Sequence, residues 1–450
     1  MEYKANQSSS KNNLRTNKLT ASLINLGCPK NQVLAEKIIY WLEQNDFSYV
    51  SFSELMPYNF VIVNTCGYLK TARMETDLLL EKLQTYHQRN PQANIIFLGC
   101  DVTLRADSLE AKYPEFTFLR EKDSLAALNH YFKLSHKTNG IYQTISDEQY
   151  AYIQIAEGCD HQCSYCLIPT IKGKYSSFPL EGILQQVNNI IQRFSIKEVI
   201  LIAQDTSSYG KDLQGHQSLI DVAKNLSELK DLKWIRCLYL YPTSRPDFFR
   251  ELLSVPKVVP YLDLPLQHVS KKILHAMNRP VLTDHFIEKI MALKKDFPSL
   301  AVRTTFIVGF PGETEEEFQN LLKSLETYQF DRAGFFTYSA EPHTKAQQLE
   351  SSISEEVKEN RLKMAYETQR MISEKINQKW IHQTLPVLIE KYDPIRKGFT
   401  GRTTREAPEI DNSVFIPTTL ANPRKLCGQL VPMLIEEADA YRIKGRLLSL

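Results

Sequence analysis

The chain has 450 residues, of which 43% are hydrophobic and 24% charged, and its formal net charge is +2. A chain of this length and ordinary globular composition is expected to contain about three domains. Its small net charge excludes a broad positively charged surface for binding nucleic acid. The sequence contains no apolar run near the ~18 residues that a membrane helix needs. The 8 cysteines are too few for a disulfide scaffold, so they indicate metal or redox chemistry in a reducing cytoplasm.

The amino-terminal end, residues 1–18, is polar and rich in Ser, Asn and Lys. It lacks the apolar core of a signal peptide, and we interpret it as a disordered tail. Residues 19–135 then contain continuous apolar runs, which predict strands buried on both faces of a parallel sheet, with helices between them in a βαβ arrangement. The expected strands are 21–26, 60–64 and 94–98, and the expected helices include 34–44 and 75–88.

Each of these three strands is followed by a cysteine: Cys28, Cys66 and Cys100. Because the carboxyl ends of neighbouring parallel strands lie together at one edge of a sheet, we expect the three thiols to converge. Three thiolates can hold a 4Fe–4S cluster and leave one iron open. Buried cysteines also serve as small hydrophobic residues in strands, but three at equivalent strand ends favour a cluster.

The region 145–375 alternates strands and helices often enough to predict a partial (βα)6 barrel of the TIM type. Its last stretch, 355–375, is densely charged and is interpreted as a solvated helix that leads to the next domain. The expected strands are 152–155, 198–203, 234–239, 261–264, 302–308 and 333–337, and the expected helices are 180–193, 219–229, 247–253, 283–295 and 314–328.

Cys159, Cys163 and Cys166 follow the first barrel strand with the spacing C-x3-C-x2-C. The loop therefore belongs at the carboxyl mouth, where such barrels keep their chemistry. Three thiolates without a fourth cysteine suit a 4Fe–4S cluster whose open iron chelates S-adenosylmethionine (SAM), and one electron from that cluster can cleave SAM to a 5′-deoxyadenosyl radical. The alternative is a zinc site with His161 as fourth ligand, although zinc sites usually pair their cysteines as C-x2-C.

The region 377–450 has five short strand patterns separated by turn signals, which predict a small antiparallel barrel resembling an OB fold. Its eleven Lys and Arg exceed its eight Asp and Glu by three, which does not argue for RNA binding by itself. The expected strands are 385–390, 399–404, 413–416, 429–436 and 441–447.

The chain resembles the radical SAM methylthiotransferase family over about residues 20–447. The stretches that carry the resemblance are 26–31, 64–67, 155–175, 201–206, 264–268 and 307–314. The resemblance implies an amino-terminal cluster domain, a radical SAM core and a TRAM domain, which match 19–135, 145–375 and 377–450. The sequence departs from the family at Asp101–Leu104, at Leu34 and Ala35, and at Asn278–Pro280, which lacks an expected glycine.

Two stretches resemble the branch that modifies an aspartate of small-subunit ribosomal protein S12. One is 238–243. The other is 401–403 followed by 407–411, where Ala407–Asp411 is acidic and is interpreted as binding a basic ribosomal protein, the alternative being a polar turn. The remaining hypotheses are the same chemistry on a tRNA adenosine and, in a different class, a non-catalytic, zinc-stabilised RNA-binding protein.

The resemblance implies that Cys159, Cys163 and Cys166 hold the cluster that cleaves SAM. It also implies that Cys28, Cys66 and Cys100 hold a second cluster that presents sulfur on its open iron, so that the β-carbon of the aspartate receives a methylthio group at the expense of two SAM molecules. No catalytic side chain beyond the cluster ligands is expected. The implied partners are ribosomal protein S12, free or in the subunit, and an electron donor such as flavodoxin or ferredoxin, and the enzyme is expected to be a monomer.

Several other residues are assigned SAM-contacting or structural roles. Tyr165, between two ligands, is expected beside the adenine, and the turn of Gly309, Phe310, Pro311, Gly312 and Glu313 is expected to approach SAM closely through its glycines, the alternative being an ordinary strand-to-helix turn. Cys237 is interpreted as core, Cys427 as an unpaired loop residue and His161 as a solvated loop residue. A site role and a structural role remain open for Asp263.

Overall fold

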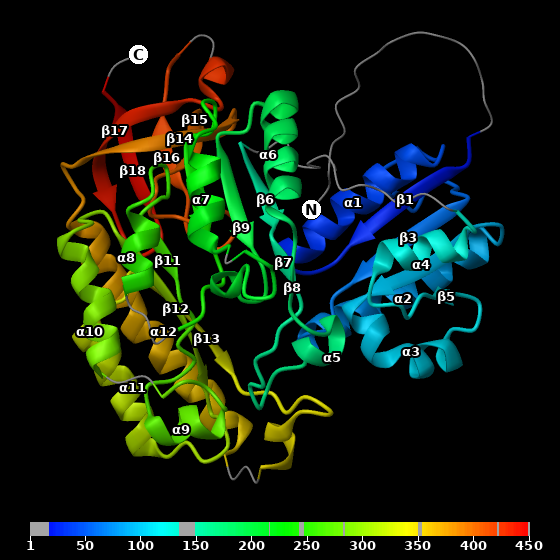
Figure 1. Ribbon diagram of the computed structural model, residues 1–450, viewed down its shortest axis with the longest axis horizontal. Coiled ribbons are helices and arrows are strands. Elements are labelled where there is room, and N and C mark those ends of the chain that lie inside the picture. The colour runs from blue at the N-terminus through cyan, green and yellow to red at the C-terminus, as the bar shows by residue number, and fades with distance from the viewer. Residues whose placement is uncertain are drawn as a thin grey trace. The chain divides into compact units, whose positions relative to one another are not determined.

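The computed structural model describes residues 18–134, 149–215, 217–242, 247–281, 284–349, 353–420 and 423–448. The expected disordered tail, apart from Lys18, lies outside these residues. The chain forms two compact units: the first contains residues 1–145 and 167–173, and the second contains residues 146–166 and 174–450 (Figure 1). Among the described residues, no helix combines the length and apolarity needed to cross a bilayer.

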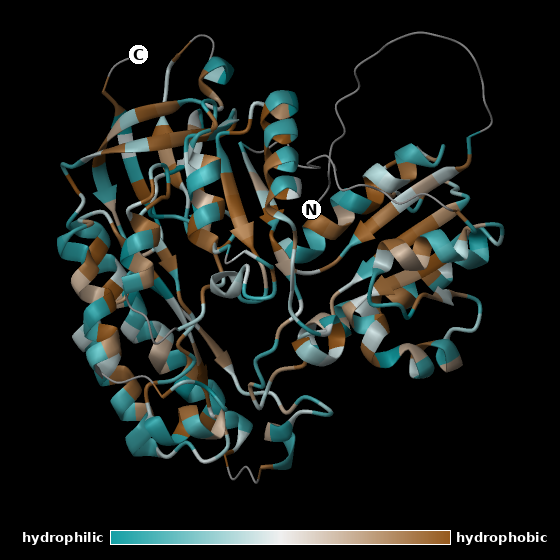
Figure 2. Cartoon of the chain, in the orientation of Figure 1, coloured by the Kyte–Doolittle hydropathy of each residue, from teal (hydrophilic) through white to brown (hydrophobic). Residues whose placement is uncertain are grey.

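The first unit is a five-stranded parallel sheet in the order β2-β1-β3-β4-β5. Successive strand residues contribute to two apolar cores, one on each face of the sheet. Ile62 and Leu98 pack with α1 on one face, whereas Val63 and Phe97 pack with α2 and α3 on the other. Figure 2 shows the resulting apolar strands between helices of mixed character. The strands are β1 (Thr20–Asn25), β2 (Ser48–Tyr49), β3 (Phe60–Thr65), β4 (Asn94–Gly99) and β5 (Thr117–Phe118); the helices are α1 (Pro29–Gln44), α2 (Lys70–Arg89), α3 (Cys100–Lys112), α4 (Ser124–Tyr131) and α5 (Ile168–Lys172).

This arrangement confirms the three predicted strands and the predicted burial of both sheet faces. Two short edge strands, β2 and β5, were not predicted; each is two residues long and only partly buried. Two-residue strands leave too little periodicity to detect.

The second unit contains six parallel barrel strands at the predicted places. They form two three-stranded ladders, β10-β9-β6 and β11-β12-β13. The ladders are joined where Val259 N–H donates to Ile235 O at 2.9 Å and Leu240 N–H donates to Asp263 O at 3.0 Å. The strands are β6 (Tyr150–Gln154), β9 (Glu198–Ile202), β10 (Trp234–Cys237), β11 (Tyr261–Asp263), β12 (Ala301–Val308) and β13 (Arg332–Thr337); a hairpin of β7 (Ala156–Glu157) and β8 (Ser176–Ser177) flanks the cysteine loop.

Helices cover the outer face of these strands, where the largest apolar core lies. Cys237 belongs to that core, as predicted. The helices of this unit are α6 (Leu180–Phe194), α7 (Leu219–Ser227), α8 (Asp247–Leu253), α9 (Lys271–Ala276), α10 (Asp284–Ala292), α11 (Glu315–Tyr328) and α12 (Glu355–Gln378), with 3-10 turns η1 (Thr206–Ser208), η2 (Leu293–Lys295) and η3 (Lys345–Gln348).

The interpretation of 355–375 as a solvated helix is wrong for one face of α12. Ala365, Ile372 and Ile376 belong to the barrel core. Lys358 and Arg361 are buried as well, and Arg361 forms an ion pair of 2.6 Å with Glu313. Charge density misleads here because inward-facing cations find partners on other elements, which the local sequence does not reveal.

The carboxyl-terminal region of this unit is a closed five-stranded barrel in the order β14-β15-β16-β18-β17. All pairs are antiparallel except β16 with β18, which run parallel. The predicted small barrel is thus confirmed, with one parallel pair that the antiparallel prediction did not include. Its elements are β14 (Thr384–Asp393), β15 (Gly398–Arg402), β16 (Val414–Pro417), β17 (Leu430–Ala438), β18 (Ile443–Leu447) and the 3-10 turn η4 (Pro423–Leu426).

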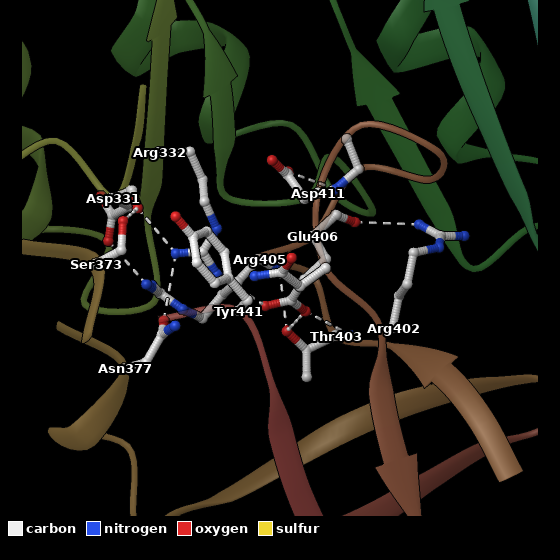
Figure 3. A network of polar contacts seen from close by, with 12 residues as sticks. Asp331, Arg332, Ser373, Asn377, Arg402, Thr403, Arg405, Glu406, Asp411 and Tyr441 are labelled. Atoms are coloured by element: carbon white, nitrogen blue, oxygen red, sulfur yellow. Dashed lines mark hydrogen bonds and ion pairs between the residues drawn. The ribbon is translucent and has the colours of Figure 1, made fainter. Parts of the chain in front are cut away.

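The loop that follows β15, Arg402–Asp411, docks on the amino-terminal ends of the parallel strands. Tyr150 at the start of β6 donates its hydroxyl to Glu409 at 2.9 Å, and Tyr261 at the start of β11 donates to Asp411 at 2.6 Å. Arg405 pairs at 2.7 Å with Asp331, the residue before β13, and Figure 3 shows how Thr403 and Glu406 fold the loop upon itself.

These contacts give Ala407–Asp411, which was interpreted as binding a basic protein, a structural role within the unit. Ala407 and Pro408 are buried, and the carboxylates of Glu409 and Asp411 accept hydrogen bonds from tyrosines of the parallel strands. The acidic stretch therefore joins two parts of one unit. The sequence shows its acidity but not the barrel hydroxyls that it binds.

Candidate metal centres

Cys28, Cys66 and Cys100 lie at one edge of the sheet in the first unit. The strands that precede them, β1, β3 and β4, are parallel neighbours, and their last residues pair as Asn25 with Asn64 and Thr65 with Gly99. Each thiol follows its strand by one to three residues, because β1 ends at Asn25, β3 at Thr65 and β4 at Gly99. Cys28 then begins α1 as its N-cap, and Cys100 is the first residue of α3.

Glycines permit the close approach of these turns. A Cβ on Gly27 (φ +101°) would lie 2.9 Å from the Cys66 sulfur, and one on Gly67 would lie 2.6 Å from Cα of Asp101, the neighbour of Cys100. Burial raises the pKa of the Cys66 thiol, and the nearby thiol of Cys28 raises it further. We call these three closely packed turns, at Cys28, Cys66 and Cys100, the cysteine cradle; an added methyl group at Gly27 or Gly67 would find no room there.

Two asparagines, Asn31 and Asn64, connect these turns through hydrogen bonds. Neither was predicted as a functional residue from the sequence. Asn31 donates to the carbonyls of Leu26 at 2.6 Å and Thr65 at 3.1 Å, so it ties the first cysteine turn to the second. Asn64 donates to Asn25 Oδ1 at 2.7 Å and to the Asn31 carbonyl at 3.0 Å. Both residues lie within the stretches that carry the family resemblance, which was the available signal.

The departure from the family after Cys100 produces an ion-pair network. Asp101 is fully buried and accepts from Arg105, one helical turn later, at 2.6 Å, and Arg105 also pairs with Asp77 of α2 at 2.9 Å. Burial raises the pKa of Asp101, and Arg105 opposes that shift. The network fastens the first turn of α3, and with it Cys100, to α2.

In the second unit, Cys159, Cys163 and Cys166 occupy the loop between β7 and α5. The Cys166 N–H donates to the Cys163 carbonyl at 3.1 Å, which curls the loop. Burial raises the pKa of Cys159 to about 12, and the thiols of Cys166 and Cys163 contribute to that rise.

The cysteine loop is clamped to the end of α9. Ser164 donates its backbone N–H to the Met277 carbonyl at 2.9 Å and its hydroxyl to Ala276 O at 2.8 Å. The Asn278 side chain donates to the Gln162 carbonyl at 2.7 Å. Arg279 follows at once, with its Nη1 3.9 Å from the Cys163 sulfur and its Nε buried without a hydrogen-bond partner.

His161 is not the solvated loop residue that the sequence suggested. Its ring stacks on Tyr241 at a centroid distance of 3.7 Å and an interplanar angle of 6°, and its Nε2 lies 2.7 Å from Asp205 Oδ2. Asp205 also accepts from the hydroxyls of Ser207 and Ser208. Burial would raise the pKa of Asp205, but these hydrogen bonds and His161 lower it. Asp205 lies in the stretch 201–206 and Tyr241 in the stretch 238–243, both of which resemble the family. The last residue of the second stretch, Thr243, lies outside the described residues.

The turn predicted to contact SAM is largely engaged with the protein. Phe310 is fully buried and lies edge-to-face with Tyr165 and Tyr338, at centroid distances of 6.4 and 5.0 Å. Both oxygens of Glu313 accept from the Gly309 N–H, and Arg361 pairs with one of them. A Cβ on Gly309 would lie 2.4 Å from Lys358 Cγ, whereas Gly312 faces open space. Pro311 is buried. SAM contact by Tyr165 and by Gly309–Glu313 stays a prediction.

Asp263 has a structural partner in the barrel interior. It forms an ion pair of 2.7 Å with Arg303 and accepts the Tyr239 N–H at 2.9 Å. Tyr239 has φ +60°, so the chain leaves β10 two residues earlier than the predicted strand end. The structural alternative for Asp263 is thus the one that the contacts support.

Within the described part of the chain, no group of three or more His, Cys, Asp and Glu side chains is placed to hold one metal ion. Thiolates are the usual ligands of 4Fe–4S clusters, and each triad offers three of them. The cradle at Gly27 and Gly67, and the orphaned Nε of Arg279 beside Cys163, are the features that fit such a group.

Three family models match successive parts of the chain. The uncharacterized protein family UPF0004 matches residues 20–120, the radical SAM superfamily matches 153–325, and the TRAM domain matches 381–448. The first match contains one cysteine triad, and the second contains the other.

Relatives of similar length match almost the whole chain. The ribosomal protein uS12 methylthiotransferase RimO of Carboxydothermus hydrogenoformans is 37% identical over 441 residues, which cover 95% of this chain and 99% of the relative. The proteins of the same name from Desulforamulus reducens and Dictyoglomus thermophilum are 36% and 35% identical, covering 94% and 95% of this chain and 98% and 99% of their own.

Solved structures share the fold at low sequence identity. The radical S-adenosylmethionine methyltransferase TsrM from Kitasatospora setae, solved with cobalamin and a 4Fe–4S cluster bound, superposes with a TM-score of 0.54 at 12% identity, covering 73% of this chain and 77% of TsrM. The cobalamin-dependent S-adenosylmethionine radical enzyme OxsB gives 0.51 at 13% identity, covering 73% of this chain and 54% of OxsB.

Proposed function

The chain belongs to the radical SAM methylthiotransferase family, in its ribosomal protein uS12 branch, and from this membership we propose that it adds a methylthio group to the β-carbon of an aspartate in ribosomal protein S12. It is a transferase that uses 4Fe–4S clusters and SAM. The relatives' shared name argues against the tRNA adenosine hypothesis, and family membership argues against the non-catalytic zinc-stabilised RNA-binding protein.

The observation that carries the proposal is the placement of six cysteines in two triads: one on three turns that follow the parallel strands β1, β3 and β4, and one in the single loop between β7 and α5. We assign Cys159, Cys163 and Cys166 to the cluster that binds and cleaves SAM. The second cluster is assigned to Cys28, Cys66 and Cys100. The hydrogen bonds of Asn31 to the Leu26 and Thr65 carbonyls and of the Ser164 backbone to Met277 support these assignments, since each holds a cysteine loop in place through contacts outside the cysteines.

The chemistry requires a radical because the aspartate β-C–H bond is unactivated and no side-chain base removes such a proton. When bound, one cluster would supply the electron that cleaves SAM, and the other would present on its open iron the sulfur that is inserted, whether that sulfur is external sulfide or drawn from the cluster. The protein's own residues hold the two loops: Asn31 and Asn64 tie the first, and Ser164 and Asn278 tie the second. We further assign 19–135 to the cluster domain, 145–375 to the radical SAM core and 377–450 to the TRAM domain.

The finer partner assignments follow from the same chemistry. Cleavage of SAM needs an external one-electron donor, for which flavodoxin or ferredoxin is suited. We propose a cytoplasmic monomer, because 4Fe–4S clusters with an open iron need a reducing compartment and each triad draws all its thiols from one chain.

The decisive experiment pairs anaerobic purification with mass spectrometry of the substrate. The protein should be brown with about eight irons per chain, and host cells that lack the gene should contain S12 lighter by one methylthio group while tRNA modification is unchanged. Complementation with Cys163→Ala should fail, whereas Cys427→Ala should restore the modification, because Cys427 lies in the carboxyl-terminal barrel. If the tRNA of cells that lack the gene has lost its methylthio group while their S12 still carries one, the tRNA hypothesis is favoured.

A further inference from the structure

Tyr241 is the centre of a three-layer stack beside the cysteine loop of the second unit. The His161 ring lies parallel to it at 3.7 Å, and the guanidinium carbon of Arg279 lies 4.1 Å from its ring centroid. One ring face has room for only one planar group at such distances, so His161 and Arg279 cover opposite faces. The stack joins three segments that are far apart in the sequence.

Arg279 is the member of the stack that reaches a cluster ligand. Its Nη1 is 3.9 Å from the Cys163 sulfur, and its Nη2 donates to the Pro265 carbonyl at 2.6 Å. The residue is only 8% exposed, yet its Nε has no hydrogen-bond partner among the described residues. A buried guanidinium with an unused donor next to a thiol indicates a missing negatively charged neighbour.

No carboxylate near Arg279 neutralises its charge in the contacts that the structure describes: its partners are a sulfur, a carbonyl and an aromatic ring. Arginine stays protonated in proteins, so this charge is permanent. Stacking on an aromatic face holds a guanidinium in a defined plane. The charge is therefore both fixed in position and largely shielded from water.

A 4Fe–4S core with three thiolates carries net negative charge, and one-electron reduction makes it more negative. The potentials of such clusters depend on net charge, hydrogen bonds to the sulfurs and solvent exposure. A permanent cation within 4 Å of one ligand stabilises the reduced state more than the oxidised state. It thereby raises the midpoint potential and eases reduction by a donor.

We propose that Arg279, stacked on Tyr241, is a positioning residue that raises the reduction potential of the cluster held by Cys159, Cys163 and Cys166. The proposal rests on the proposed function only in that these cysteines hold a 4Fe–4S cluster. The part of Tyr241 is to hold the Arg279 guanidinium on its ring face, beside the Cys163 sulfur.

The test is an EPR-monitored redox titration of the full chain with Cys28, Cys66 and Cys100 replaced by Ala, so that one cluster remains. Into this parent we introduce Arg279→Gln, Arg279→Lys, Tyr241→Leu and, as an exposed control, Arg446→Gln. Arg279→Gln should lower the reduced-to-oxidised ratio at a fixed potential about tenfold, a shift of about 59 mV for one electron. Tyr241→Leu should shift the potential in the same direction, whereas Arg279→Lys and Arg446→Gln should stay close to the parent.

Three results would overturn the proposal: an unchanged potential in Arg279→Gln, equal shifts in Arg279→Lys and Arg279→Gln, or loss of iron from Arg279→Gln and Tyr241→Leu while the parent keeps about four irons. The last would make the stack a structural support for cluster assembly. A parent that binds no iron is a different outcome, because it refutes the assignment of the cysteines and with it the proposed function.

Discussion

Glu198 and Arg402 form an ion pair of 2.7 Å in which both side chains are almost fully buried, although they lie 204 residues apart in the sequence. Glu198 is the first residue of β9, and Arg402 is the last residue of β15. The other carboxylate oxygen of Glu198 accepts from Arg236 of β10 at 2.7 Å. One carboxylate thus binds the parallel strands and the carboxyl-terminal barrel together.

Glu198→Gln should destabilise the second unit strongly. The variant leaves Arg236 and Arg402 facing a neutral amide in a buried site, and breaking a buried ion pair in this way costs about 3–5 kcal/mol. Chemical denaturation followed by circular dichroism measures the free energy of unfolding. The control is Glu437→Gln, which removes an exposed pair with Lys444 and should cost at most about 1 kcal/mol. Equal effects of the two changes would contradict the role assigned to Glu198.

Acid should weaken the docking of the loop Arg402–Asp411. Burial alone would raise the pKa of Glu198 and of Asp331, but their arginine partners lower both pKa values below the ordinary 4.5 and 3.8. A lowered folded-state pKa gives stability that is complete above the unfolded-state value and is lost as the pH falls through the folded-state value. We expect the melting temperature to fall below pH 4.5, with a smaller fall in Glu198→Gln. A melting temperature that is flat down to about pH 3 would refute this.

Cys66→Ala and Cys163→Ala should separate the two proposed chemical steps. Each should retain about four of the eight irons. Cys66→Ala should still release 5′-deoxyadenosine from SAM but transfer no methylthio group, whereas Cys163→Ala should do neither. Iron analysis, chromatography of SAM products and the mass of S12 provide the three measurements. Methylthiolated S12 from Cys66→Ala would show that the first triad does not supply the sulfur.

Gly27→Ala should damage the first cradle without unfolding the protein. The added methyl would lie 2.9 Å from the Cys66 sulfur at a backbone φ of +101°, which side chains rarely adopt. We expect loss of about half of the bound iron with a far-ultraviolet circular dichroism spectrum like that of the wild type. Gly182→Ala is the matched control: its methyl would meet nothing within 4 Å in α6, and it should raise stability by about 0.5–1 kcal/mol. Full iron content in Gly27→Ala would exclude the cradle.

Much of the architecture could be predicted because the pattern of apolar residues along the chain indicates where strands and helices lie. Continuous apolar runs identified β1, β3 and β4 to within a few residues, since burial on both faces requires consecutive apolar side chains. The alternation of strand and helix patterns identified the six barrel strands equally closely. The convergence of Cys28, Cys66 and Cys100 at one sheet edge also followed, because parallel neighbours place their carboxyl ends together.

The features that the sequence did not reveal share a cause: polar side chains pair with partners that lie far away in the sequence. The charges of α12 and the acidic stretch Ala407–Asp411 suggested solvent or a partner protein, yet Arg361 meets Glu313 and Asp411 meets Tyr261. The roles of His161 and Arg279 were equally hidden, because the ring between them belongs to Tyr241.

By itself, the sequence determined the order of helices and strands and the positions of the sulfur ligands along the chain, because these depend on neighbouring residues. Only the tertiary structure decided which buried charges neutralise one another and which cation remains beside Cys163. The physical reason is that the cost of burying a charge is set by the partners and the dielectric around it, and both come from residues that the fold gathers from distant parts of the chain.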